Sequence, residues 1–362
     1  MSTTTNYRYG GSKAQFGISN TIPTGTDSQY SYCFGTGSTM VGDADGRFAA
    51  GGAHILSGGA KYATALGYAN EIDNLYGFAA GQGNDIKTTA SGAWGAAVIG
   101  KQNRISQGDD GCIVMGTSNI LSTGGAASTG RGNIVAGYSI EHYGGGAGCL
   151  VGGYFSSLGK FGDAAVNIGA GCLTAGYINT MYGVHGSVIG DQNICGITGN
   201  RKEGRDSLAM GRQVHAKYAG GLTFGGGAHS ATGDSQSTLA VAKIQTTDAT
   251  ATELLFGDGS NTHRAIIAND TTAVFEALIV GRQTDADGNS AAYKIQGAID
   301  NNATTVALVG VPTVTTIGED TAGWEVSAVA DDTNKSLKLL VTGAAGDAVN
   351  WTGQLNIIEV TG

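Results

Sequence analysis

Pairs of acidic residues are the first place to look for chemistry in this sequence, because enzymes that cleave glycans use two carboxylates as acid, base or nucleophile. The candidate pairs are Asp43/Asp45, Asp109/Asp110 and Asp331/Asp332. They stand in turn-like segments such as GDADG and QGDDG, where acidic side chains are usually solvated. We therefore expect no catalytic residue, and the sequence predicts that this chain is not an enzyme.

Histidine and cysteine offer few ways to hold a metal or to act as a nucleophile. No two histidines have the spacing H-x-x-x-H or H-E-x-x-H, and no two of the five cysteines form C-x-x-C. We expect the histidines at corners or on the surface, and the cysteines as reduced, buried thiols. The segment DADGN at residues 285–289 shares part of a calcium loop but lacks the later glutamate, so it predicts a hairpin turn. The sequence predicts neither a metal nor a cofactor.

Aromatic side chains are the remaining candidates for a binding surface, because an exposed ring has an apolar face and often a polar edge. Tyrosines cluster in the middle of the chain, at Tyr138, Tyr143, Tyr154, Tyr177 and Tyr182. Rows of tyrosine also stabilise stacked strands, and this structural interpretation is favoured. Tyr138, Tyr143 and Trp94 are the candidates for a binding surface, whereas Trp324 and Trp351 are expected in a core.

The composition indicates a folded protein with an excess of glycine. Glycine accounts for 63 of the 362 residues and proline for 2, while 41% of the residues are apolar. Collagen needs abundant proline and disordered chains have low hydrophobicity, so both classes are excluded. The net charge of -9 argues against nucleic acid as a partner. No uninterrupted apolar run is long enough to predict insertion into a membrane.

The glycines belong to a repeat, since 50 of the 63 lie in residues 1–231. A phrase of the form apolar-x-small-glycine recurs, ending at Gly35, Gly51, Gly67, Gly81, Gly100, Gly116, Gly137, Gly152, Gly169, Gly190, Gly211 and Gly225. Three residues later stand Asn70, Asn84, Asn103, Asn119 and Asn193, with His54 as a variant. Each unit predicts a short strand ending at glycine, a corner where asparagine accepts a left-handed φ, and a second short strand. Residues 32–231 are thus predicted to form a parallel β-roll or β-solenoid shaft.

The interior of this shaft is expected to be narrow, because small residues precede several of the repeat glycines. These residues are Ala50, Ala80, Ala136 and Ala209. A narrow rung buries little apolar surface, so several chains would have to pack side by side. The sequence therefore predicts a homotrimer.

The remainder of the chain has the pattern of a different β-domain. Residues 251–362 contain nine short segments with period-2 alternation, among them AVFEALIVGR, AAYKIQGAID and SLKLLVTG. They predict an antiparallel β-sandwich of the jelly-roll kind. Residues 232–250 are polar and lack the repeat, which predicts a junction, and residues 1–31 predict an N-terminal attachment segment.

Two resemblances follow from these segments. The repeats resemble the head repeats of trimeric autotransporter adhesins of the YadA type, which form a left-handed parallel β-roll in a trimer. Repeats of this kind also occur in bacteriophage fibres, which are made in the host cytosol, and Met1–Thr26 contains no apolar signal segment. Thr252–Val360 resembles the C-terminal domain of certain phage tail fibres, through LIVGRQTDADGNSAAYKIQGAIDNN and VNWTGQLNIIEV.

These resemblances imply a structural and adhesive virion protein of a bacteriophage, a trimeric tail fibre or spike assembled in the host cytoplasm. The implied partners are two further copies, other tail or capsid proteins bound through the N-terminal segment, and a glycan or outer-membrane protein of the host surface. Three weak sites acting together would bind such a repetitive surface. Two alternatives stay open: a tailspike that depolymerises polysaccharide, and a fibre attached to the capsid.

Overall fold

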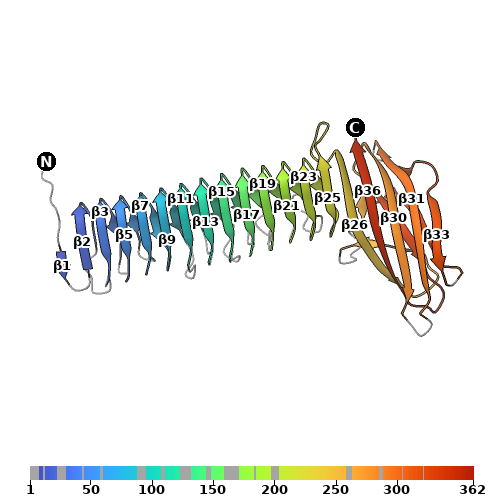
Figure 1. Cartoon of the computed structure of the whole chain (residues 1–362), viewed down its shortest axis with the longest axis horizontal. Coiled ribbons are helices and arrows are strands. Elements are labelled where there is room, and N and C mark those ends of the chain that lie inside the picture. Colours follow the sequence, from blue (N-terminus) through green and yellow to red (C-terminus); the bar gives the residue numbers. More distant parts are fainter. Residues whose placement is uncertain are drawn as a thin grey trace. The chain divides into compact units, whose positions relative to one another are not determined.

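The computed structural model describes residues 8–10, 13–22, 30–42, 45–57, 60–87, 95–106, 111–122, 132–143, 148–158, 171–182, 185–196, 204–257, 263–284, 288–303, 305–320 and 322–362. The fold is all-β and contains a parallel β-solenoid of about ten turns (Figure 1). Within these ranges no helix is long and apolar enough to cross a membrane. The chain divides into two compact units, residues 1–178 and 179–362.

The first unit is a stack of two-stranded rungs. Its longer strands run parallel in the first sheet: β2 (Lys13–Ile18), β3 (Tyr32–Thr36), β5 (Phe48–Gly52), β7 (Thr64–Tyr68), β9 (Phe78–Gln82), β11 (Ala97–Lys101), β13 (Ile113–Thr117), β15 (Ile134–Tyr138), β17 (Leu150–Tyr154) and β19 (Leu173–Tyr177). The shorter strands run parallel in the second sheet: β4 (Thr39–Met40), β6 (Ile55–Leu56), β8 (Glu71–Asp73), β10 (Asp85–Lys87), β12 (Arg104–Ser106), β14 (Ile120–Ser122), β16 (Glu141–Tyr143) and β18 (Ser157–Leu158). β1 (Arg8–Gly10) pairs antiparallel with β2. The predicted solenoid is confirmed.

Glycine is required where one rung lies against the next. Gly100 pairs with Gly81 and Gly116 in the neighbouring rungs, and its φ is +122°. A Cβ atom at Gly100 would lie 2.0 Å from the carbonyl oxygen of Gly116. Any side chain would therefore separate the two rungs and strain the backbone.

Two predicted details of the repeat are wrong, and a third lies outside the described residues. The strand-ending position belongs to Gly153 rather than Gly152 in β17, because Gly153 has the positive φ and pairs with Gly137. Gly169 lies outside the described residues, and Gly176 holds this position in β19. In addition β2 pairs parallel with β3, so the rungs begin within the segment 1–31 that was predicted to be an attachment segment.

The repeat asparagines have a different role from the one predicted. The left-handed residue at the corner is the preceding one, as at Gln102 and Ser118, where φ is 55° and 57°. The asparagine itself is fully buried and links rungs: Asn103 Nδ2 donates to the carbonyl of Gly116 at 2.7 Å, and its Oδ1 accepts from the amide of Asn119 at 3.1 Å. Repetition of these bonds forms an internal asparagine ladder.

His54 occupies one step of the asparagine ladder. Its Nδ1 accepts from the Asn70 amide at 3.3 Å, so its Nε2–H donates to the Ala50 carbonyl at 3.1 Å. Burial lowers the pKa of His54, which favours the neutral ring. The histidines were expected at corners or on the surface: His54 does lie at a corner, between β5 and β6, but it is buried, as are His142 and His263.

The interior of the first unit is narrow, as predicted, but different residues fill it. The side chain two positions before each repeat glycine is buried, as at Ala49, Ala79 and Val98, and so are Ile72 and Ile86 in the second sheet. The outward positions include Ala50, Ala80 and Ala136, which were predicted to line the interior; Ala209, in the second unit, does lie inside. The five cysteines are free, buried thiols, as predicted.

The second unit begins with further rungs and continues into longer strands. Its rung strands are β20 (Thr180–Met181), β21 (Ser187–Asp191), β22 (Ile194–Cys195), β23 (Leu208–Arg212), β24 (His215–Ala216) and β25 (Leu222–Gly226). β26 (Ser235–Thr246) then pairs antiparallel with β25 and, over its whole length, with β36 (Val349–Thr361). The segment 232–250, predicted to be a junction, therefore contains a long strand, in which more exposed residues alternate with buried ones such as Thr238 and Ala240.

Two antiparallel sheets complete the second unit. One continues from β36 through β30 (Thr271–Gln283) and β31 (Ser290–Asn302) to β32 (Thr305–Leu308) and β33 (Thr313–Glu319), while β28 (Leu255–Phe256) pairs with β26. The other joins β35 (Ser336–Thr342) to β34 (Glu325–Asp331), β27 (Thr252–Glu253) and β29 (Ala265–Ile266). The predicted hairpin near residues 285–289 is confirmed by the pairing of Arg282 with Ser290.

A single hydrophobic core lies between these sheets. Phe275, Tyr293 and Trp351 come from the longer sheet and pack with Leu339 and Val341 of β35. The expected burial of both tryptophans is confirmed, since Trp324 and Trp351 stack edge to face with ring centroids 5.3 Å apart. Side chains of large volume, rather than repeated glycines, hold this region together.

Candidate functional site

Of the three predicted acidic pairs, only Asp331/Asp332 lies wholly within the described residues. Asp331 accepts from Asn334 and forms an ion pair with Lys338 at 2.7 Å. Burial opposes ionisation of Asp331, but these donors outweigh it and lower its pKa. Asp332 accepts from the Val306 amide, so both carboxylates stabilise turns. Asp43, Asp109 and Asp110 lie outside the described residues.

The outer side of the first sheet is an apolar face. In the first unit it carries large side chains that remain between 37% and 48% exposed: Phe34, Ile99, Met115, Ile134 and Leu150. The outer side of the second sheet is different, because Lys87 pairs there with Glu71 at 2.9 Å and with Asp85 at 3.4 Å. The outer side of the second sheet thus carries a cluster of ion pairs over β8, β10 and β12.

The apolar face recurs in the second unit on both the rungs and the longer strands. The exposed members are Ile189, Met210, Phe224, Val241, Val274, Leu278, Val280, Ile358 and Val360. Met210 and Phe224 line one hollow together with Val274, Ile358 and Val360, so the rungs and the longer sheet present these side chains on the same side. An exposed apolar surface of this extent usually marks an interaction site.

A second exposed surface, the aromatic ridge, consists of Tyr138, Tyr154, Phe155, Tyr177 and Ile178. The three tyrosines directly follow repeat glycines and are in register, so their rings stack with centroids 4.8 Å and 5.5 Å apart. Phe155 is turned by 79° from Tyr154 at 4.4 Å. All five side chains are between 39% and 47% exposed.

The backbone of the ridge is strained. Phe155 and Ile178 both have a φ of 50°, in the left-handed region. The same corner position holds small or polar residues in other rungs, such as Ala69, Gln102 and Ser118. A β-branched or aromatic residue is costly in this conformation, so a reason for its presence is expected in its side chain.

The predicted binding candidates have different outcomes. Tyr138 is an exposed member of the aromatic ridge. Tyr143 ends β16, but its side chain lies outside the described part, as does all of Trp94. Phe155 and Ile178 were missed; the available signal was a bulky residue two positions after the repeat glycine.

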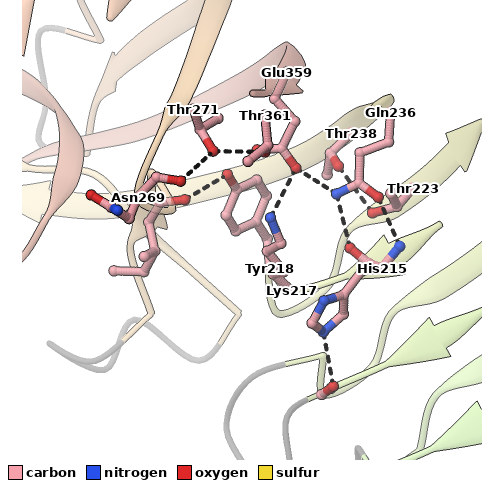
Figure 2. Close-up of polar contacts among 12 residues, drawn as sticks. His215, Lys217, Tyr218, Thr223, Gln236, Thr238, Asn269, Thr271, Glu359 and Thr361 are labelled. Atoms are coloured by element: carbon pink, nitrogen blue, oxygen red, sulfur yellow. Dashed lines mark hydrogen bonds and ion pairs between the residues drawn. The ribbon is translucent and has the colours of Figure 1, made fainter. Parts of the chain in front are cut away.

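A cavity of about 350 Å³ lies in the second unit, bordered by His215, Lys217, Tyr218, Asp234 and His263 among others. Figure 2 shows Lys217 and Gln236 converging on the carboxylate of Glu359, with an Nζ–Oε1 distance of 3.1 Å for the lysine. Burial, together with the charge of Lys217, lowers the pKa of His215 to about 4.

The polar groups around this cavity mainly bind one another. His215 Nε2 bonds the Gly196 carbonyl at 3.0 Å, and the Tyr218 hydroxyl donates to the Ile266 carbonyl at 3.1 Å. The first of these bonds joins two rungs, the second reaches β29, and the bond from Lys217 to Glu359 reaches β36, so these groups have a structural role. Across the described ranges, no three His, Cys, Asp or Glu side chains are placed to hold a metal ion.

A buried thiol pair is the remaining group of reactive type. Hydrogen bonding to Cys172 is the main cause that lowers the pKa of Cys149 to about 5; burial opposes this shift, and His142 supports it. Cys149 and Cys172 are only 2% and 3% exposed, so the thiols are shielded from any substrate.

Comparison with known proteins yields little. No family model and no curated protein matches the chain. Among solved structures, it is similar to the tailspike protein of Acinetobacter baumannii phage AM24, with 8% sequence identity, a TM-score of 0.24, and coverage of 96% of this chain and 76% of that one. A TM-score this low carries no weight for fold or function, which follow from the residues of this chain.

Proposed function

We propose that the chain is a subunit of a bacteriophage tail fibre or spike that binds the host cell surface, and that it acts by adhesion rather than by catalysis. The observation that carries this proposal is the apolar face on the outer side of the first sheet. Its exposed side chains come from several rungs of the first unit, among them β3, β11, β13, β15 and β17. A partner that covers them must be long and carry the same spacing, and a second copy of this chain fulfils both conditions.

Assembly would stabilise the shaft substantially. Covering one half-exposed Ile, Leu or Met side chain contributes on the order of 1 kcal/mol, and many such side chains recur on each chain. A closed cyclic arrangement of parallel chains covers all the apolar faces at once. Three copies is the number that the resemblance to trimeric fibres implies, and the two-sheet C-terminal region would be the sandwich module of such a fibre.

Placement on the virion follows from the same proposal. The N-terminal residues would bind other virion proteins, and assembly would take place in the host cytoplasm. Multivalent attachment would combine three weak sites at a high effective concentration. A capsid fibre would use the same architecture, so density for this chain in the intact virion would distinguish tail from capsid.

Oligomeric state is the direct test. Sedimentation velocity of the full chain should give a trimer, and Met115→Asp should dissociate it because a carboxylate cannot be buried unpaired in an apolar interface. Ser122→Asp is the matched control, since Ser122 lies on the outer side of the second sheet in the same rung. A monomeric wild-type chain, or equal loss of the trimer in both variants, would refute the assembly.

Adhesion is tested on cells. The purified trimer should bind host bacteria without degrading their polysaccharide. Release of reducing sugar ends would instead identify a depolymerase, with a site formed by residues outside the described ranges or between chains.

A further inference from the structure

The aromatic ridge is the part of the surface that assembly and folding do not explain. We propose that this ridge, formed by Tyr138, Tyr154, Phe155, Tyr177 and Ile178, binds a linear surface polysaccharide that runs along the stacked rungs. This inference rests on the proposed adhesive function and names its ligand class and its residues.

The arrangement of the rings suits a saccharide. The three tyrosines cover one another's faces, because their planes differ by only 12° and 14°, and their side chains remain 41% to 43% exposed. Phe155 lies across this stack, turned by 81° from Tyr138, and it is 47% exposed. A ring in this position offers an apolar face for the C–H side of a sugar, beside phenolic groups that can bond its hydroxyls.

The spacing of the ridge also fits a polymer. Neighbouring tyrosine rings are separated by about one rung, 4.8 Å for Tyr138 and Tyr154. This step is close to the length of one pyranose unit, so successive sugars can meet successive rungs. The ridge side chains carry no charge, which favours recognition through C–H faces and hydroxyl groups over ion pairing.

The left-handed corners explain how two side chains of the ridge come to point outward. Phe155 and Ile178 hold a left-handed φ of 50° while their side chains remain 47% and 39% exposed. Tyr62 and Tyr76 combine a left-handed φ with exposure as well, so the combination marks an outward corner; at Phe155 it places the ring across the stack of Tyr138 and Tyr154.

The first experiment needs no ligand. Ile178→Gly and Phe155→Gly should both raise the Tm of the trimer, because glycine accepts the left-handed conformation without strain. A lower Tm for both variants would show that the ridge stabilises the rungs, and would overturn the proposal.

The second experiment measures binding to cells of a strain that the trimer binds. Phe155→Gly should reduce binding at least tenfold while the trimer stays intact by sedimentation. The matched control is Tyr62→Gly, which removes one ring of the exposed stacked pair Tyr62–Tyr76, with centroids 5.3 Å apart and a left-handed φ of 53° at Tyr62. Equal losses in the two variants, or no loss in Phe155→Gly, would refute a site at the ridge.

The ligand class is tested on the same cells. Periodate cleaves the vicinal diols of glycans, so treated cells should lose binding, whereas cells treated with proteinase should keep it. The reverse pattern would identify a protein receptor. Intact trimers that bind no cells would refute the proposed adhesion itself, whereas binding that survives Phe155→Gly would refute only the ridge.

Discussion

The rungs of the first unit and the longer sheets of the second unit are both all-β, but different interactions hold them together. A rung has a small interior and depends on the backbone: glycines that permit close approach and asparagines that bond from one rung to the next. The longer sheets enclose a core of large side chains around Trp351, Phe275 and Tyr293. Stability therefore depends on backbone geometry in one region and on side-chain volume in the other.

This difference predicts opposite sensitivities to substitution. Removing side-chain volume should damage the longer sheets most, and adding even one carbon should damage the rungs most. The rungs repeat the same glycine and asparagine contacts many times, whereas each side-chain contact of the longer sheets occurs once.

The largest effect is expected for Trp351→Ala. This change removes a side chain that is 1% exposed, along with its hydrogen bond to Thr246 Oγ1 at 3.0 Å. The expected loss is about 4 kcal/mol in the free energy of unfolding of the second unit. Denaturant titration would measure it, with the exposed neighbour Thr352→Ala as a control that should change little. A loss below about 1 kcal/mol would contradict a core built on side-chain volume.

A similar loss is expected when a single carbon is added to a rung. Gly100→Ala should cost about 3 kcal/mol or more, because its Cβ would clash with the Gly116 carbonyl and its φ is positive. Gly95→Ala is the matched control: Gly95 also has a positive φ, of 72°, but nothing lies within 4 Å of the added atom. It should cost only about 1 kcal/mol. Equal losses in the two variants would show that conformation alone, not close approach, requires glycine in the rungs.

A smaller loss should follow when one step of the asparagine ladder is removed. Asn103→Ala leaves the Asn119 amide and the Gly116 carbonyl without their side-chain partner in a buried place. We expect a loss of about 2 kcal/mol. Hydrogen exchange should show faster exchange at the Asn119 amide than at amides several rungs away. Unchanged exchange there would mean that the ladder adds nothing to the backbone bonds between rungs.

The smallest effect concerns pH. Burial lowers the folded-state pKa of His54, so the unfolded chain takes up a proton first as the pH falls. The stability contributed by the neutral ring is complete above about pH 6.5, the pKa of unfolded histidine, and is lost as the pH falls toward the folded-state pKa.

Comparison with an uncharged ladder residue isolates this effect. His54→Asn, which restores the usual ladder residue, should lose less free energy of unfolding than the wild type between pH 7 and pH 5. The difference between the two proteins should be at most about 1.4 kcal/mol per pH unit. Thermal unfolding at both pH values measures the difference. Identical pH profiles would show that His54 is not the titrating group.

Much of the fold could be predicted because it depends on local pattern. The repeat glycines predicted the rungs, and period-2 alternation predicted the strands of residues 251–362. β26 was missed because its sequence, SQSTLAVAKIQT, is polar, and it becomes a strand through pairing with β36 more than a hundred residues later in the chain. Local composition carries no information about such a partner.

The candidate surfaces were only partly predictable for a related reason. Tyr138 was recognisable as an aromatic residue in a repeat, but its stacking on Tyr154 depends on the register between rungs of unequal length. Phe155 was overlooked because a left-handed φ is a property of the folded corner, not of the residue type.

Taken alone, the amino-acid sequence determined that this chain forms glycine-punctuated β-rungs followed by a second β-region, and that its cysteines are buried. These properties follow from side-chain size and spacing along neighbouring residues. Only the tertiary structure decided that asparagines point inward as a ladder, that one outer face is apolar, and that separate tyrosines stack into a ridge. Each of these depends on which residues stacking and pairing bring together across loops of varying length, and local spacing does not encode that register.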